Sequence, residues 1–164
     1  MLSLRILMDI YDKFAKAVID SEKEIIGAEH LVNFVLPVVK DSKILLRVLE
    51  QINKVIVLTI SNILKFEHLY KRVELSKDSK KNLDIFMRKC SGKYGLNEKD
   101  SEVINEILFL GKKHKESGFE FSKSGRIIIL DDELKTNELS LGKIREFIIV
   151  AKKLNNNSRE KFKG

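Results

Sequence analysis

The stretch from Ser42 to Arg72 constrains the fold more than any other part of this sequence. No Gly or Pro occurs between Asp41, which can cap a helix, and Gly92, so one long helix of about 46 Å is predicted here. Its middle, VIVLTISNIL, is apolar on all sides, which predicts that neighbouring helices cover every side of it. A strand over residues 54–60 is the competing interpretation, but the helical flanks favour a helix.

Helical spacing of apolar residues covers most of the remaining chain. Short polar residues at the expected helix starts can accept hydrogen bonds from free backbone N–H groups, and Asn97 with Asp100 resembles a capping box. The first predicted helix covers residues 2–19. The others, with their expected caps, are residues 22–37 after Asp20 or Ser21, residues 77–92 after Ser76, residues 98–116 after Asn97, and residues 141–154 after Ser140.

The apolar period changes from that of a helix to that of a strand in one place. Phe119 and Phe121 alternate with polar residues, and a tight turn at residues 122–125 precedes a β-rich run that ends at Leu130. We therefore predict a mainly α antiparallel bundle of five or six helices with a small β-hairpin at residues 119–130. A third short strand is expected near Glu138 and Leu139.

Length and composition limit the class of protein. The chain has 164 residues, which is one domain by the usual range of about 100–200 residues. We expect residues 1–154 to form this domain and residues 155–164 to form a flexible, frayed basic tail. Cys90 is the one cysteine, so a disulfide framework is excluded. Neither a membrane span nor a signal peptide is visible, and we expect a soluble, cytoplasmic protein.

Part of the sequence resembles a family of small uncharacterised archaeal helical proteins. The resemblance covers residues 25–150 and rests on an acidic-His pair, a Val-Lys-Asp turn and an aromatic-Glu element that ends a long helix. Here these are Glu29-His30, Val39-Lys40-Asp41 and Phe66-Glu67. The stretch HKESGFEFSKSGRIIILDDELKTNELSLGKIREFI resembles the closing hairpin and helix of the same family. This resemblance implies a fold and carries no function.

A broader resemblance is to HEPN domains, which are antiparallel helical bundles found in RNases and in toxin–antitoxin pairs. The RNase members carry an Arg followed a few residues later by a His. None of the Arg residues of this chain has a His at that distance. The resemblance therefore implies the bundle architecture and no nuclease activity.

No recognisable catalytic, cofactor-binding or metal-binding constellation is present. His30, His68 and His114 lie on three different predicted helices and have no paired ligand spacing. Cys90 falls on the predicted apolar face of its helix, where burial disfavours the reactive thiolate. No glycine-rich phosphate loop or nucleophile motif occurs.

Polar residues interrupt the apolar surface of the long helix at Asn53, Thr59, Asn62 and Glu67. Each of them can find a hydrogen-bond partner or face the rim of the bundle. The alternative is a polar pocket between helices that binds a small ligand.

Basic residues are unevenly distributed, although the net charge of +7 rests on many Lys and few Arg. Such a composition is weak evidence for nucleic-acid recognition, which uses Arg more often. Ordinary solvated helix faces explain these residues. The alternative is an anion-binding or RNA-binding face that combines two helices, formed by Lys77, Lys81, Arg88, Lys112, Lys113 and Lys115.

These observations favour a non-enzymatic binding or scaffold module that acts through protein–protein contacts or self-association. The partner is then another protein or a second copy of the chain. The alternative is an RNA-binding or regulatory module of HEPN-like architecture that uses the basic helix face. An enzyme whose site the sequence does not reveal is the third hypothesis.

Overall fold

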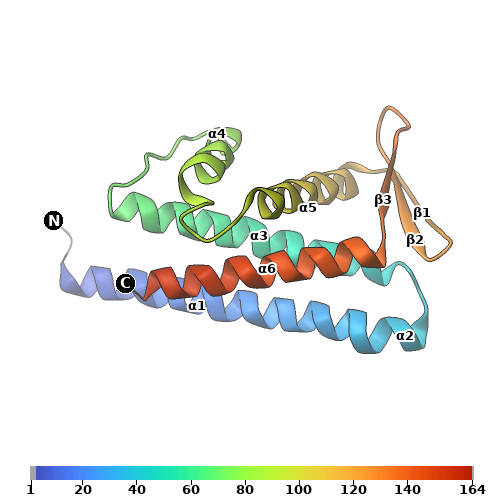
Figure 1. Cartoon of the computed structure of the whole chain (residues 1–164), viewed down its shortest axis with the longest axis horizontal. Helices are drawn as coiled ribbons and strands as arrows, with labels where there is room; N and C mark the ends of the chain where they lie inside the picture. The colour runs from blue at the N-terminus through green and yellow to red at the C-terminus, as the bar shows by residue number, and fades with distance from the viewer. Residues whose placement is uncertain (1–2, 164) are drawn as a thin grey trace.

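A computed structural model describes residues 3–163 of the chain and shows a helical bundle with a small antiparallel sheet at one end (Figure 1). The predicted fold class is therefore confirmed. The helices α1 (Leu4–His30), α3 (Ile44–Leu69) and α6 (Leu141–Phe162) run side by side. The shorter α4 (Ser79–Ile85) and α5 (Glu98–Glu116) lie on the far side of α3 from α1. Leu2 and Gly164 fall outside the described residues.

The first two predicted helices are one continuous helix, so the predicted break at Asp20 or Ser21 was wrong. The buried residues of α1 follow a single line at spacings of three and four residues, with Ser21 as one of its members: Phe14, Val18, Ser21, Ile25 and Ala28. No Pro occurs within α1, and its one Gly, Gly27, lies near the C-terminal end without ending the helix. The small hydroxyl side chain of Ser21 fits in the core between larger residues. Ser3, rather than a residue further along, caps the helix by accepting from Ile6 N–H.

Pro37 changes the geometry of the helix that precedes it. Since Pro has no N–H and its ring clashes with the carbonyl four residues earlier, the turn η1 (Leu31–Val35) adopts π-helical geometry, with Leu36 N–H donating to Leu31 O. The short helix α2 (Leu36–Val39) follows, and Lys40 takes a left-handed conformation with φ 57°. The chain then reverses into α3.

The helix α3 is the centre of the bundle and packs against α1, α5 and α6. It is shorter than predicted at both ends, and Asp41 accepts a hydrogen bond from Lys43 N–H in the turn before it (3.0 Å). One line of its side chains is almost fully buried, including Val48, Ile52, Ile56 and Ile63. Val57 and Leu58 are 48% and 47% exposed, so the prediction that neighbours cover all sides was wrong.

The predicted helix over residues 77–92 begins later and is divided. Asp78, rather than Ser76, caps α4, and Lys77 lies in the preceding loop. The helix ends in the π-helical turn η2 (Phe86–Cys90), which buries Phe86 and also Cys90, the latter as predicted. The predicted bounds of α5 and the capping box between Asn97 and Asp100 are confirmed.

The three strands pair in sequence order as an antiparallel sheet: β1 (Phe119–Lys123), β2 (Arg126–Leu130) and β3 (Thr136–Leu139). Phe119 pairs with Leu130 and Lys123 with Arg126, which confirms the hairpin. Ser124 and Gly125 both have positive φ, as a two-residue hairpin turn requires. Ile127 and Ile129 are buried, so the face of the sheet that carries them packs against the core.

The last helix is longer than predicted, since α6 continues through residues 155–162, which were expected to form most of a tail at residues 155–164. Ser140 caps α6 as expected. Asn155 donates to the carbonyl oxygen of Val18 at 3.2 Å, and Phe162 packs against Phe14 and Phe66 with ring centroids at 5.1 and 4.8 Å. Among the described helices, none combines the length and the apolar character needed to cross a membrane.

Candidate binding groove

A groove runs along the outer face of α3, where this helix is least covered by its neighbours. Two hollows of about 570 and 390 Å³ meet at Val57, which lines both of them. The first hollow lies between α3 and α5, and the second lies between α3, α4 and α5. Apolar side chains form most of the floor: Val57, Leu58, Ile60, Leu64, Leu83 and Leu108.

Gly111 allows α5 to form one wall of this groove. A methyl group on Gly111 would lie 2.5 Å from Oδ1 of Asn53, which is too close for any real contact. The absence of a side chain at Gly111 therefore sets how closely α5 approaches α3. The Asn53 side chain lies on the groove floor and has no hydrogen bond within residues 3–163.

Lysines from three helices border the groove: Lys54 of α3, Lys80 of α4 and Lys115 of α5. All three are exposed. Lys54 forms a long ion pair with Glu24 of α1 (3.5 Å). Lys80 and Lys115 form no ion pair within the described part of the chain. The carboxylate of Glu50, also at the border, is engaged by His114.

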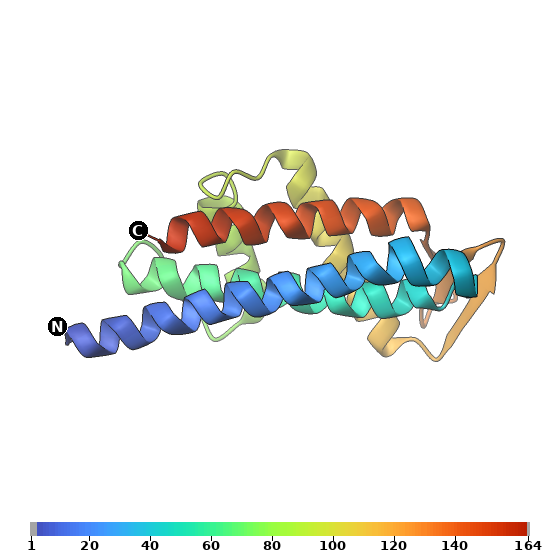
Figure 2. The same ribbon diagram turned by 90° about the horizontal axis from the view of Figure 1, so that it is seen from below.

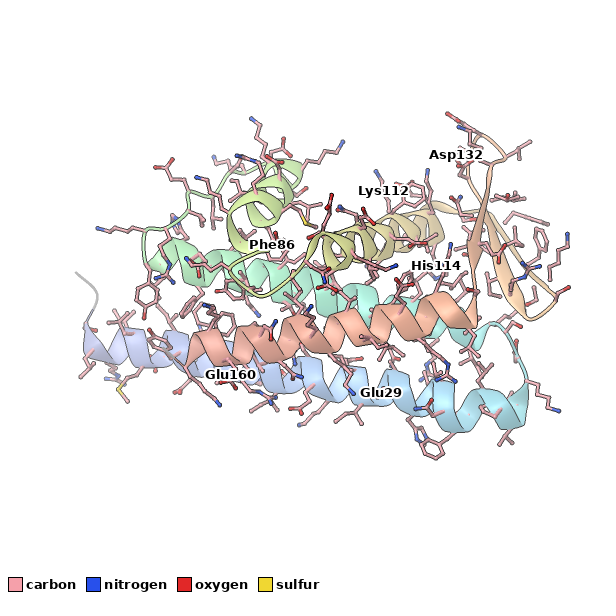
Figure 3. All side chains as sticks on the ribbon, viewed as in Figure 1. Glu29, Phe86, Lys112, His114, Asp132 and Glu160 are labelled. Carbon is pink, nitrogen blue, oxygen red and sulfur yellow. The ribbon has the colours of Figure 1, made fainter. Side chains whose placement is uncertain are left out.

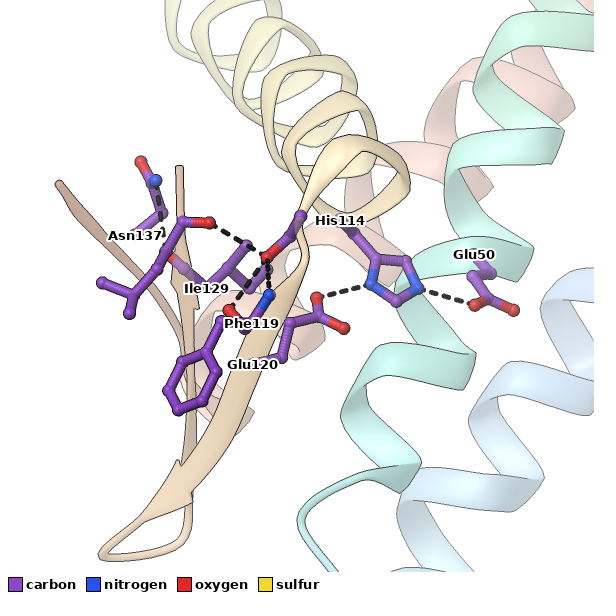
Figure 4. Close-up of polar contacts among 8 residues, drawn as sticks. Glu50, His114, Phe119, Glu120, Ile129 and Asn137 are labelled. Atoms are coloured by element: carbon purple, nitrogen blue, oxygen red, sulfur yellow. Dashed lines mark hydrogen bonds and ion pairs between the residues drawn. The ribbon is translucent and has the colours of Figure 1, made fainter. Parts of the chain in front are cut away.

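His114 closes the groove at the end nearest the sheet and connects three elements (Figure 4). Its Nε2 lies 2.7 Å from Oε1 of Glu50 on α3, and its Nδ1 lies 2.6 Å from Oε2 of Glu120 on β1. With a carboxylate at each nitrogen, the imidazole donates at both positions only when it is protonated.

This arrangement stabilises the protonated form of His114. Burial of the ring opposes the charged form, but the hydrogen bonds with Glu50 and Glu120 outweigh burial and raise the pKa of His114 above its ordinary value. The protonated ring therefore fastens the sheet to the helical bundle at this end of the groove.

The six basic residues predicted to form one face lie in two separate groups. Lys77, Lys81 and Arg88 belong to the α4 region, where Arg88 pairs with Asp84 at 2.8 Å. Lys112, Lys113 and Lys115 lie in the last turns of α5, and Lys112 is labelled in Figure 3. Lys112 lies 4.0 Å from Glu116, and Lys113 lies 4.0 Å from Asp131. The two groups therefore come from the α4 region and from α5, and a common anion-binding face formed by both stays a prediction.

Among the polar residues of the long helix, Glu67 has internal partners rather than a ligand site. Its carboxylate accepts from Arg72, from Lys93 Nζ at 3.1 Å and from Tyr94 Oη at 2.8 Å. Burial would raise the pKa of Glu67, but these donors lower it to about 2. This buried ion pair holds the loop after α3 and the turn before α5.

The other predicted reactive groups lie apart. Burial, followed by the nearby charge of Glu67, raises the pKa of the Cys90 thiol to about 11. His30 stacks on Phe34 with ring centroids at 5.4 Å, and Nδ1 of His68 lies 3.1 Å from the carbonyl oxygen of Val73. Residues 3–163 contain no group of three or more His, Cys, Asp or Glu side chains placed to hold a metal ion.

Neither the groove nor the contacts of His114 with Glu50 and Glu120 were predicted from the sequence. The groove depends on which side of an all-apolar helix stays uncovered, and Glu50 and Glu120 lie far from His114 in the sequence. Gly111 was a usable signal, because a Gly inside a helix often marks a close packing contact.

Comparisons with known proteins give no relative of this chain. No family model matches it, and neither the curated proteins nor the solved structures include a match.

Proposed function

We propose that this protein is a binding module whose α3 groove holds an amphipathic helix with acidic flanks from a partner protein. The observation that supports this proposal most is the exposure of Val57 and Leu58, at 48% and 47%, in the middle of the most apolar helix. Apolar grooves lined by helices commonly accept the apolar face of another helix.

The dimensions of the groove suit a helix rather than a single side chain. From Glu50 to Leu64 it follows α3 for about 21 Å, the length of roughly four helical turns. Val57 lines both hollows, so they lie next to each other along α3. A partner helix can place apolar residues at i, i+3 or i+4, and i+7 along it.

The charged residues at the border of the groove favour a partner helix with acidic residues. Lys80 and Lys115 border the groove without ion pairs in the described residues, and Lys54 has only a long one. The acidic residue at the same border, Glu50, already pairs with His114. Acidic residues beside the apolar face of a partner helix would meet these lysines, which favours their orientation and rate of association.

Two designed peptides of about four helical turns test the proposal. Both carry Leu along one face, and they differ in having either Glu or Lys beside that face. We expect fluorescence anisotropy to show the Glu peptide binding about tenfold more tightly than the Lys peptide. Equal affinity for the two peptides, or no binding of either, would overturn the proposal.

Variants of the groove locate the binding. Leu58→Ser should weaken binding of the Glu peptide, whereas Val38→Ser, at an exposed position on α2, should leave it unchanged. Lys115→Glu should weaken binding, whereas Lys99→Glu on the same helix should have little effect. If both members of a pair act alike, the groove is not the binding site.

A single-stranded RNA oligonucleotide separates the RNA-binding alternative from this proposal. If the RNA binds with a steep salt dependence, and binding is lost in Lys81→Ala/Arg88→Ala, the basic residues near α4 carry the function. Absence of RNA binding, together with binding of the Glu peptide, would support the groove.

A further inference from the structure

An apolar stripe lies on the outer face of α1, away from the groove of α3. Its members fall within about 60° of the helix circumference at 100° per residue and stay exposed to solvent: Leu4, Met8, Ala15, Ile19 and Ile26. The exposed fractions of Leu4, Met8, Ile19 and Ile26 range from 49% to 75%. From Leu4 to Ile26 the stripe is about 33 Å long. Figure 2 shows that the N-terminal end of α1 extends past the ends of α3 and α6.

One edge of the stripe carries three charged side chains that form no ion pair within residues 3–163, namely Arg5, Asp12 and Lys23, of which the last two have opposite charges. Asp12 and Lys23 are exposed, and neither forms an ion pair within residues 3–163. They are eleven residues apart in the sequence, which is about three helical turns, so they lie on the same side of α1. Lys16 lies between them but further from the stripe, with Asp12 and Asp20 four residues away on either side.

The acidic residues on the opposite edge of the stripe already form ion pairs with residues of the same chain. Glu22 pairs with Arg159 of α6, and Glu29 pairs with Lys152 of α6 at 3.2 Å. Of the charges left without partners beside the stripe, Asp12 and Lys23 lie nearly symmetrically about its middle, whereas Arg5 lies near its N-terminal end.

We propose that this stripe binds a second copy of the chain, with the two α1 helices antiparallel about a two-fold axis. In this arrangement Met8 lies opposite Ile26 of the second copy, and Ala15 lies opposite Ile19. The same register brings Asp12 of each copy beside Lys23 of the other. The surface is thus complementary to itself, as a two-fold interface requires. This proposal does not depend on the groove of α3.

The charges also decide the direction of the two helices. A parallel arrangement would place Asp12 against Asp12 and Lys23 against Lys23, which costs free energy. One helix face buries a small area compared with stable protein interfaces. We therefore expect a dimer that dissociates on dilution.

Sedimentation velocity of the full chain over a range of concentrations tests whether the dimer forms. We expect a concentration-dependent shift from monomer to dimer in the wild type. Ile19→Lys should abolish the shift, whereas Ile6→Lys should keep it, because Ile6 is similarly exposed (47%) on the opposite side of α1. A wild type that stays monomeric, or a dimer that survives Ile19→Lys, would overturn the proposal.

A charge exchange tests the register. Asp12→Lys and Lys23→Asp should each lose self-association, since each places like charges together. An equimolar mixture of these two variants should form a heterodimer, because every position-12 residue then faces an opposite charge at position 23. The double variant D12K/K23D should dimerise like the wild type. Circular dichroism confirms that each variant is folded, and failure of both the mixture and the double variant to associate would contradict the antiparallel pairing.

Discussion

Gly111 of α5 packs directly against Asn53 of α3, and a methyl group in place of the Gly111 hydrogen would lie 2.5 Å from Asn53 Oδ1. This contact determines how deeply α5 sits against the central helix, and hence the width of the groove beside it. The effect of a substitution at Gly111 on the free energy of unfolding therefore depends on which residue occupies position 53.

Gly111→Ala should destabilise the wild type by about 1 kcal/mol. Overpacking costs about 1–3 kcal/mol, and the better helix propensity of Ala returns about 1 kcal/mol. In an Asn53→Ala background the clash is removed, so the same change should stabilise the protein. Urea unfolding of the four proteins of this cycle measures the reversal of sign. A Gly111→Ala variant that is more stable than the wild type would contradict the close contact.

Glu67→Gln should destabilise the protein by about 2–3 kcal/mol, because hydrogen bonds to a buried charged group are among the strongest. The pKa of Glu67 is lowered from 4.5 to about 2 by Arg72, Tyr94 and Lys93. The contribution of the carboxylate is therefore complete above pH 4.5 and is lost as the pH falls toward 2. The difference in unfolding free energy between wild type and variant should shrink over this window. Glu74→Gln, at an exposed position, serves as the control.

His114→Gln should remove a stabilising contribution that depends on pH in the opposite direction. Because the pKa of His114 is raised above 6.5, the charged ring contributes fully below pH 6.5 and its contribution is lost as the pH rises through the raised value. The wild type should therefore be more stable than the variant near pH 6, and the two should converge at higher pH. Chemical denaturation between about pH 6 and 9 measures this. A difference that grows with pH would contradict the protonated bridge, and His30→Gln is the matched control.

Phe162→Ala should destabilise the protein by about 3 kcal/mol, as expected for removal of a buried aromatic side chain. The ring packs between Phe14 and Phe66 at the end of the bundle, so its loss leaves a cavity. Lys161→Ala, at the exposed neighbouring position, should change stability by less than about 0.5 kcal/mol. Thermal unfolding of both variants provides the comparison, and equal stability would mean that the end of α6 is frayed in solution.

Most helices and the hairpin could be predicted because their signals are local. The capping box at Asn97 and Asp100, the cap at Ser140 and the change of period at Phe119 all lie within a few residues of the boundary that they predict. The predicted break at Asp20 or Ser21 was wrong because a short polar residue can cap a helix or lie within one. The burial of Ser21 in a continuous line from Phe14 to Ala28 resolves this, and that line depends on packing against other helices.

The candidate sites could be predicted only in part. Lys115 was predicted to bind an anion together with basic residues of α4, and the structure places it at the border of the α3 groove. The sequence also did not predict that α6 continues beyond residue 154. Asn155 and Ser158 are polar, and their burial depends on packing against α1.

The sequence by itself determined a mainly helical chain with one hairpin, since helix periodicity, caps and turn residues act over a few neighbouring positions. It also determined that an all-apolar segment would form the central helix. Only the tertiary structure decided which side of that helix stayed open at Val57 and Leu58, and which carboxylates His114 joined. Those outcomes depend on how separate helices and strands pack together, and residues distant in the sequence carry no local pattern that reports their contact.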